Sequence, residues 1–193
     1  MTSLPRAYFE DVYRANDDPW HFETSTYEAE KYAATVAALP RARYRSGYEV
    51  GCSLGVLTER LAERCDRLLA VDTVSSVLER AKARCRRFTH VRFEETHLPA
   101  ALPDDAFDLV VLSEVGYYFA ANALVTVAHD LVAAMAPGGH LILVHWTPFV
   151  PDYPLTGDQV HETFLALTGS GGPLEHLLGR REETYRLDLL ERR

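Results

Sequence analysis

From residue 47 onward, short apolar runs alternate with longer segments of helical periodicity. Runs typical of β-strands occur at about 47–51, 67–72, 90–94, 107–113 and 139–146. Between them, apolar residues recur every three to four positions at about 55–65, 74–86 and 121–135, which predicts helices. Strands that alternate with helices predict βαβ units with right-handed crossovers and a parallel sheet.

The last third of the chain changes this pattern. Asp108 to Ser113 is almost continuously apolar, as a central strand covered on both faces should be. Pro137-Gly138-Gly139 predicts a turn before the next strand, and a helix is expected near 157–167. Two short strands joined near 180–183 predict a C-terminal hairpin. We therefore expect a Rossmann-like α/β fold with a seven-stranded, mostly parallel sheet and an antiparallel last strand.

Residues 5–39 look helical and amphipathic, in two pieces broken at Asp17-Asp18-Pro19. The second piece opens at Thr24-Ser25, and Glu28 stands three residues after Ser25, which is the spacing of a capping box. Two helices are therefore expected before the first strand.

Composition narrows the class of protein. The 193 residues suffice for one domain with one core, and 47% hydrophobic with 25% charged residues is typical of a soluble globular protein. A net charge of −8 argues against a nucleic-acid partner. The three cysteines lack the pairing of a disulfide framework or a zinc site, and no apolar run is long enough to span a membrane. We expect a cytoplasmic protein with no nucleic-acid or membrane partner; the oligomeric state is left open.

A glycine-containing turn between the first strand and its helix is the strongest local signal. It reads Glu49-Val-Gly51-Cys-Ser53-Leu-Gly55. Gly51 permits a tight turn, Gly55 lets the helix approach a ligand, and Glu49 can hold a charged group. Asp72 ends the second strand, where a carboxylate can accept hydrogen bonds from both ribose hydroxyls.

A dinucleotide site also places an acidic residue about twenty positions after a glycine-rich turn. The spacing here, however, is E-x-G-x-x-x-G, and no glycine occupies the position that approaches a pyrophosphate. A cofactor that carries a ribose and an amino-acid tail but no phosphates suits this turn better. An NAD-dependent oxidoreductase is the alternative.

Residues 46–146 resemble class I methyltransferases. Glu49 to Gly55 resembles their first motif and Asp72 their ribose-binding residue, while Asp108 to Tyr118 and Met135 to His140 resemble later motifs. The resemblance implies S-adenosylmethionine as cofactor and S-adenosylhomocysteine as product. Ser53 stands where many members have glycine, and Glu95-Thr96-His97 stands where an Asp usually contacts the adenine. With the motif residues, the resemblance implies a cofactor site that includes Thr73, Thr96, His97 and Glu114.

A narrower resemblance, to nodulation protein S (NodS)-type N-methyltransferases, covers nearly the whole chain. It rests on Asp18-Pro-Trp20-His-Phe22, on Ser-Glu-Val-Gly-Tyr-Tyr at 113–118, and on His145-Trp146 with the segment 154–161. It implies that the N-terminal segment, with Trp20, covers the cofactor. We therefore expect one methyltransferase domain with a helical lid at 1–40, a cofactor-binding core at 41–146 and an acceptor-side segment at 147–193.

The same resemblance implies an amine of an amino sugar or oligosaccharide as methyl acceptor. Glu114 follows the fourth strand and His145 ends the fifth, so both are candidate catalytic residues, the histidine as a base. Tyr117, Tyr118 and Trp146 are candidate acceptor-binding residues, although each is as easily explained by core packing. Asp158 and His161, at i and i+3 of one helix, are either a capping pair or part of the acceptor site.

Three alternatives stay open at this point. The acceptor atom can be a hydroxyl, which needs a general base far more than an amine does. The chain can be an NAD-dependent oxidoreductase, or a non-catalytic subunit that only binds the cofactor. No metal site is expected, because Glu114, His145, Asp158 and His161 form no recognisable ligand motif.

Overall fold

In a computed structural model, residues 1–99, 102 and 106–193 are described. Their contacts group them into two compact units. The N-terminal unit comprises Pro5–His97, and the C-terminal unit comprises Leu98–Arg193 together with Met1–Leu4. Each unit carries its own strands and helices, and the division of the chain into lid, core and acceptor-side segments remains a prediction.

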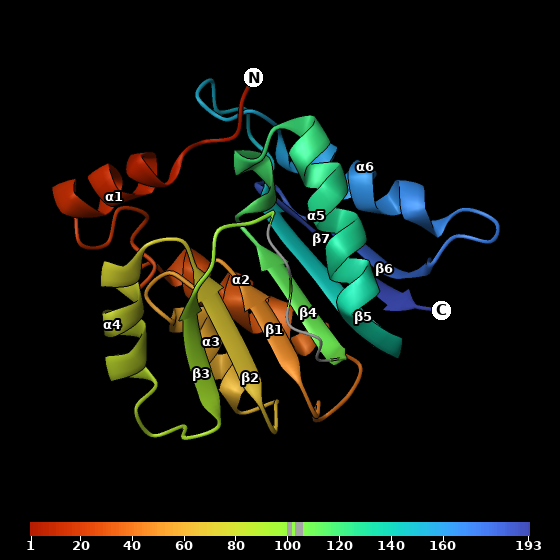
Figure 1. Cartoon of the computed structure of the whole chain (residues 1–193), viewed down its shortest axis with the longest axis horizontal. Helices are drawn as coiled ribbons and strands as arrows, with labels where there is room; N and C mark the ends of the chain where they lie inside the picture. The colour runs from red at the N-terminus through yellow and green to blue at the C-terminus, as the bar shows by residue number, and fades with distance from the viewer. Residues whose placement is uncertain (100–101, 103–105) are drawn as a thin grey trace. The chain divides into compact units, whose positions relative to one another are not determined.

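The N-terminal unit contains three parallel strands in the order β3-β2-β1, which lie side by side in Figure 1. Its elements in chain order are α1 (Arg6–Ala15), α2 (Thr26–Ala37), β1 (Gly47–Val50), α3 (Val56–Ala62), β2 (Leu68–Asp72), α4 (Ser75–Arg84) and β3 (Val91–Glu95). Helix α3 contacts α2, α4 and β2, so these helices form a layer against the strands. The predicted alternation of strands and helices is confirmed here.

The two N-terminal helices form where the sequence predicts them. Ser25 caps α2, and its hydroxyl accepts a hydrogen bond from the Glu28 backbone N–H. The Glu28 carboxylate binds Lys31 at 2.9 Å and the two side chains are buried as a pair, so the reciprocal half of a capping box is not what this glutamate provides. Helix α1 packs Phe9 and Tyr13 against the turn that follows β1.

The C-terminal unit contains four strands in the order β4-β5-β7-β6. Its elements are β4 (Phe107–Ser113), the 3₁₀ turn η1 (Gly116–Tyr118), α5 (Ala121–Ala134), β5 (Met135–Trp146), α6 (Gly157–Leu165), the 3₁₀ turn η2 (Ala166–Thr168), β6 (Leu174–Arg181) and β7 (Tyr185–Arg192). Strand β5 is parallel to β4 and antiparallel to β7, and β7 is antiparallel to β6. The predicted C-terminal hairpin is therefore confirmed.

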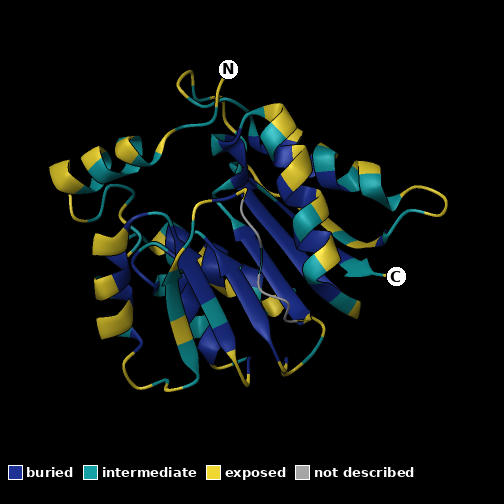
Figure 2. Cartoon of the chain, in the orientation of Figure 1, coloured by how far each residue is buried: buried dark blue, intermediate teal, exposed yellow. Residues whose placement is uncertain are grey.

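Burial explains the apolar runs. Leu109, Val110, Val111 and Leu112 of β4 are 0% exposed, and Figure 2 shows β4 and most of β5 as buried. Strand β5 begins earlier than the sequence indicates, because Met135 already pairs with Phe107 and the register then shifts so that Leu109 pairs with His140. The predicted glycine turn, with Gly138 at φ 73°, lies inside this irregular start of the strand.

No helix among the described residues is both long and apolar enough to cross a bilayer.

Candidate functional site

The turn after β1 has the backbone conformation that its glycines predict. Gly51, Ser53 and Gly55 all have positive φ, at 72°, 48° and 76°. A Cβ on Gly55 would lie 3.0 Å from the Cα and Cβ of Ala81 in α4, which is too close for a side chain at that φ. Gly55 therefore allows α3 to start directly against α4, and the loop presents its backbone at the carboxyl end of β1.

Asp72 holds this loop in place. Its carboxylate accepts a hydrogen bond from the backbone N–H of Ser53 at 2.9 Å and another from Val74 at 3.0 Å. Burial raises the pKa of Asp72, and the backbone N–H donors oppose that shift. Each carboxylate oxygen can accept more than one hydrogen bond, so Asp72 retains capacity for two hydroxyl donors.

Glu49 lies on β1 beside β2 and is 2% exposed. Its Oε2 atom is buried and has no hydrogen-bond partner. Burial raises the pKa of Glu49 to about 8. A buried, unsatisfied carboxylate oxygen is unfavourable in isolation. A cationic ligand group would supply the missing partner; that Glu49 binds one remains a prediction.

Three further predicted cofactor residues follow β2 and β3. The Thr73 hydroxyl and His97 Nδ1 lie 2.9 Å apart, which ties together the segments after these two strands. The Thr96 backbone N–H donates to the carbonyl of Asp72 at 3.0 Å. The structure thus brings Thr73, Thr96 and His97 together with Asp72; that they contact a cofactor remains a prediction.

Helix α1 and the segment after it touch the same loop. The Tyr13 hydroxyl is hydrogen-bonded to Ser53 Oγ, and burial raises the pKa of this phenol, so it stays protonated. Trp20 packs edge-on against Tyr13 at 5.6 Å and stacks with Phe22 at 5.5 Å. Trp20 therefore lies next to a residue that contacts the loop. His21 is exposed.

Tyr13 itself is a residue that sequence reasoning missed. The amphipathic pattern of α1 identifies it as a position that faces the protein, but its partner Ser53 lies forty residues away.

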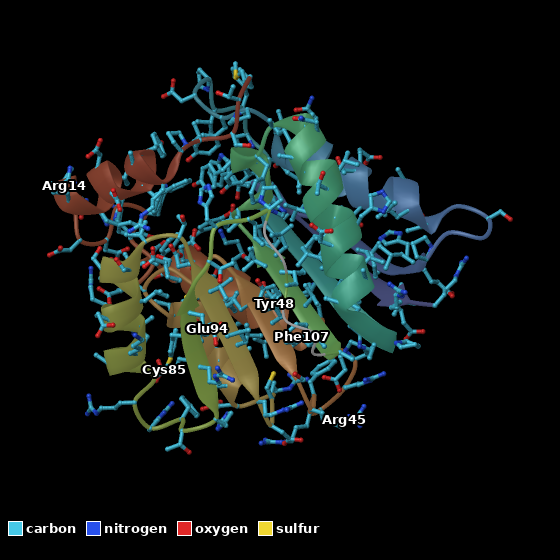
Figure 3. All side chains as sticks on the ribbon, in the orientation of Figure 1. Arg14, Arg45, Tyr48, Cys85, Glu94 and Phe107 are labelled. Carbon is cyan, nitrogen blue, oxygen red and sulfur yellow. The ribbon has the colours of Figure 1, made fainter. Side chains whose placement is uncertain are left out.

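The end of α4 also supports the loop from Gly51 to Gly55. Arg84 Nε donates to the carbonyl of Leu54 at 2.9 Å, and the thiol of Cys85, labelled in Figure 3, lies 3.8 Å from the carbonyl of Gly55.

In the C-terminal unit, Glu114 is held at the end of β4 in a strained conformation with φ 58°. Its backbone N–H donates to Val144 at 2.8 Å. Its Oε2 accepts hydrogen bonds from the Tyr117 hydroxyl at 2.6 Å and from the Trp146 backbone N–H at 2.9 Å. The end of β5 therefore fixes both the backbone and the side chain of this carboxylate.

The two predicted tyrosines form a cluster with a third that sequence reasoning missed. Tyr117 is buried and stacks on Tyr153 at 4.9 Å, while Tyr118 contacts both rings edge-on. Tyr153 lies in the proline-rich loop before α6, where neither strand nor helix periodicity marks it. Trp146 is half-buried at the end of β5. The assignment of these residues to an acceptor site remains a prediction.

His145 and His161 are both 0% exposed and are hydrogen-bonded to each other. Asp158 does not join them: it forms a two-pronged ion pair with Arg181 at 2.6 and 2.8 Å on the surface. Thr156 and Gln159 form the capping box of α6 instead. The interpretation of Asp158 and His161 as a capping pair is therefore wrong, because Asp158 pairs with an arginine at the surface whereas His161 is buried.

Groups of three or more His, Cys, Asp or Glu with a geometry suited to a metal ion do not occur among the described residues.

Comparison with known proteins gives a consistent set of relatives. The family model for nodulation protein S (NodS) matches residues 10–146. Nodulation protein S of Sinorhizobium fredii is 32% identical over 130 residues, 66% of this chain and 60% of the relative. The protein of the same name from Bradyrhizobium diazoefficiens is 35% identical over 66% of this chain and 62% of the relative. The matched region thus spans about 60% of the length of these relatives.

Solved structures extend the likeness beyond residue 146. A putative methyltransferase from Pseudomonas syringae is 36% identical, with a TM-score of 0.76 over 87% of this chain and 100% of that one. The N-methyltransferase NodS from Bradyrhizobium japonicum in complex with S-adenosyl-L-homocysteine is 24% identical, with a TM-score of 0.80 over 95% and 97%. These likenesses confirm the predicted fold, a Rossmann-like seven-stranded, mostly parallel sheet with an antiparallel last strand.

Proposed function

The chain belongs to the nodulation protein S (NodS) family, and we propose from this premise that it is a methyltransferase that uses S-adenosylmethionine to methylate an amine of a polar small molecule. The acceptor class that this family membership supports is an amino sugar or an oligosaccharide that carries a free amine. S-adenosylhomocysteine, which accompanies the Bradyrhizobium japonicum relative, is the expected product.

The buried Oε2 of Glu49, which has no partner, is the observation that carries this proposal. S-adenosylmethionine has an α-ammonium group in its amino-acid tail, and a cation of this kind supplies the missing hydrogen bond. The loop from Gly51 to Gly55, bent by three residues with positive φ, follows β1 directly, and we place the amino-acid tail there. Asp72 at the end of β2 is suited to the two ribose hydroxyls, and no bound phosphate is needed to explain any of these groups.

The chemistry needs little from the protein beyond position. When bound, the cofactor supplies a sulfonium-activated methyl group that a nucleophile can displace in line. An amine reacts as its neutral form, so the protein must bind the acceptor and remove one proton from it. Glu114, whose carboxylate is fixed by Tyr117 and by the end of β5, is our candidate for holding the acceptor amine.

His145 is a weaker candidate for the proton acceptor than the sequence suggested. It is fully buried, and its Nε2 accepts a hydrogen bond from the Gly116 backbone N–H at 3.1 Å. A ring nitrogen with its lone pair directed at a backbone donor is poorly placed to take a proton from an acceptor. We therefore propose a positioning role for His145. Tyr117, Tyr118 and Trp146 remain candidates for the acceptor pocket.

A screen for transfer of labelled methyl groups tests this function. The probes are glucosamine and a chitotetraose with one free amine, and the matched control is the fully N-acetylated chitotetraose. We expect label on the two amines and none on the acetylated sugar, with mass spectrometry placing the methyl on nitrogen. Label on both tetraoses would indicate O-methylation. Absence of transfer to all probes, in protein that binds the cofactor, would favour a non-catalytic binding subunit.

A further inference from the structure

A chain of buried polar side chains runs through the C-terminal unit behind Glu114. His145 Nδ1 lies 3.1 Å from His161 Nε2, and His161 Nδ1 lies 2.6 Å from Asp188 Oδ2. These three side chains come from β5, α6 and β7 and are at most 1% exposed. Such a network is costly to bury unless every member is satisfied, so its arrangement is informative.

The backbone N–H of Gly116 fixes the direction of every hydrogen bond in this chain. It donates to His145 Nε2, so that nitrogen carries no proton. A neutral imidazole protonated on one nitrogen must then hold its proton on Nδ1, which donates to His161 Nε2. His161 in turn carries its proton on Nδ1 and donates to the Asp188 carboxylate. One tautomer of each histidine satisfies all three contacts.

The chain ends at the turn that carries the proposed acceptor residues. Val144, His145 and Trp146 at the end of β5 each make one hydrogen bond to Glu114 or Gly116. Helix α6 closes on the same turn, because a Cβ on Gly116 would lie 2.4 Å from Val160. One of the contacts that hold this turn, from the Gly116 N–H to His145 Nε2, therefore depends on the tautomer of His145.

We propose that His161 and Asp188 are positioning residues that hold His145 in its Nδ1–H tautomer, so that His145 fixes Gly116 and, through this turn, the carboxylate of Glu114. This inference rests on the proposed function only in giving Glu114 an acceptor role. None of the three touches the reacting atoms in this account. Their effect on the reaction is exerted through the geometry of the turn.

The charges around His161 determine the pH range in which the hydrogen bonds from His145 through His161 to Asp188 persist. Asp188 also accepts from Arg186 at 2.7 Å and lies 2.6 Å from His176, while Asp158 and Glu162 contact Arg186 from α6. Burial lowers the pKa of His161 below its usual value of 6.5, although Asp188 opposes this shift. Once protonated, His161 has two N–H donors and cannot accept from His145. The hydrogen bond from His145 to His161 is therefore present at neutral pH and is lost at acidic pH.

Two substitutions separate position from packing. His161→Gln keeps one acceptor and one donor, whereas His161→Leu keeps the bulk and removes both. His176→Gln is the matched control, because His176 binds the other oxygen of Asp188 and lies off the path to His145. With the free-amine chitotetraose as acceptor, we expect His161→Leu to lower kcat about 10- to 100-fold with unchanged cofactor affinity. His161→Gln should restore most of it, and it should not show the fall in kcat that we expect of the wild type at acidic pH.

Nuclear magnetic resonance of the full chain, labelled with ¹⁵N-histidine, tests the inference without any acceptor. We expect both His145 and His161 to be Nδ1–H tautomers in the wild type and in His176→Gln. In His161→Gln we expect the same tautomer for His145. The Gly116 amide should exchange with solvent roughly tenfold faster in His161→Leu, as loss of about one hydrogen bond implies. An Nε2–H tautomer at His145, or a Gly116 amide unaffected in folded His161→Leu, overturns the inference. Absence of methyl transfer in a wild type with the expected tautomers would instead count against the proposed function.

Discussion

Two buried carboxyl groups on the neighbouring strands β1 and β2 differ in their hydrogen-bond partners. Asp72 accepts two backbone N–H groups, whereas Glu49 has a buried oxygen without a partner. Both have a pKa that burial raises, to about 8 for Glu49. The free protein therefore keeps most of its Glu49 protonated at neutral pH, and a cationic ligand would reverse this.

Binding of S-adenosylmethionine should therefore release a proton. With the pKa of Glu49 near 8, close to one proton per site is expected to leave at pH 7, because the ligand ammonium stabilises the carboxylate. Calorimetric titrations in buffers of different ionisation enthalpy measure this number. Glu49→Gln should bind more weakly and release none; equal release by this variant would show that another group titrates.

Asp72→Ala should weaken cofactor affinity about 10- to 100-fold, because a hydrogen bond to a charged group contributes about 1.5–3 kcal/mol. The same change leaves the Ser53 and Val74 N–H groups without their acceptor, so some thermal stability should be lost as well. Isothermal titration of the folded variant measures the affinity. Asp66→Ala, an exposed aspartate of the same unit, is the control and should bind as the wild type does. Unchanged affinity in Asp72→Ala would remove Asp72 from the cofactor site.

Spacing along the chain identified residues whose partners are close in sequence. Glu49, Gly51, Ser53 and Gly55 share one turn, so the motif specifies their arrangement. Other contacts join residues far apart: Ser53 to Tyr13, forty residues away, and His161 to Asp188, twenty-seven away. Periodicity indicates that such side chains point inward but carries no information on which polar groups meet, so Asp188 and the role of His145 could not be predicted.

At the scale of elements, α1 is the helix to which only the family resemblance assigned a function. Phe9 and Tyr13 pack against Leu54, Val74 and Val77, that is, against the loop from Gly51 to Gly55 and the start of α4. The helix therefore contributes to the order of this loop within the N-terminal unit. Deleting residues 1–22 would test a lid only coarsely, because Ser3 and Leu4 form hydrogen bonds with residues 118–120 of the C-terminal unit.

Tyr13→Phe is a sharper test of α1. It removes the hydroxyl that binds Ser53 and keeps the ring against Leu54, so the helix should stay folded. We expect a 2- to 10-fold loss of cofactor affinity, in line with about 0.5–1.5 kcal/mol for one hydrogen bond. Arg14→Ala, on the exposed side of the same helix and labelled in Figure 3, should have no effect. Titration of the tryptophan fluorescence with the cofactor measures the affinity of both variants. Equal affinities would make the contact irrelevant to binding.

The strands and helices themselves were largely predictable, since a buried strand in an α/β fold must be apolar throughout. The bounds of β4 match the predicted range, β1 ends one residue earlier, β2 begins one residue later, and β3 is shifted by one residue. Strand β5 is the exception, because Pro137 and Gly138 mark a turn in sequence although the irregular start of the strand contains them. Local turn chemistry there competes with pairing to β4, which the sequence alone does not reveal.

For the whole molecule, Glu49 should make stability depend on pH. Its folded pKa, about 8, lies above its unfolded value of 4.5, so its contribution is fully present below pH 4.5 and is lost as pH rises through 8. Denaturant unfolding of the cofactor-free protein should show wild type losing a few kcal/mol relative to Glu49→Gln across this window. Glu63→Gln, an exposed control, should follow the wild type. Parallel curves for wild type and Glu49→Gln would mean that Glu49 is ionised in the free protein.

The identity of the cofactor decides the whole account, and a direct titration of the full chain with S-adenosylmethionine and with NAD⁺ tests it. The buried Glu49 oxygen, the left-handed loop from Gly51 to Gly55 and Asp72 predict saturable binding of one S-adenosylmethionine per chain and no measurable heat with NAD⁺. Saturable binding of NAD⁺, with no binding of S-adenosylmethionine, would contradict this assignment and favour an NAD-dependent oxidoreductase.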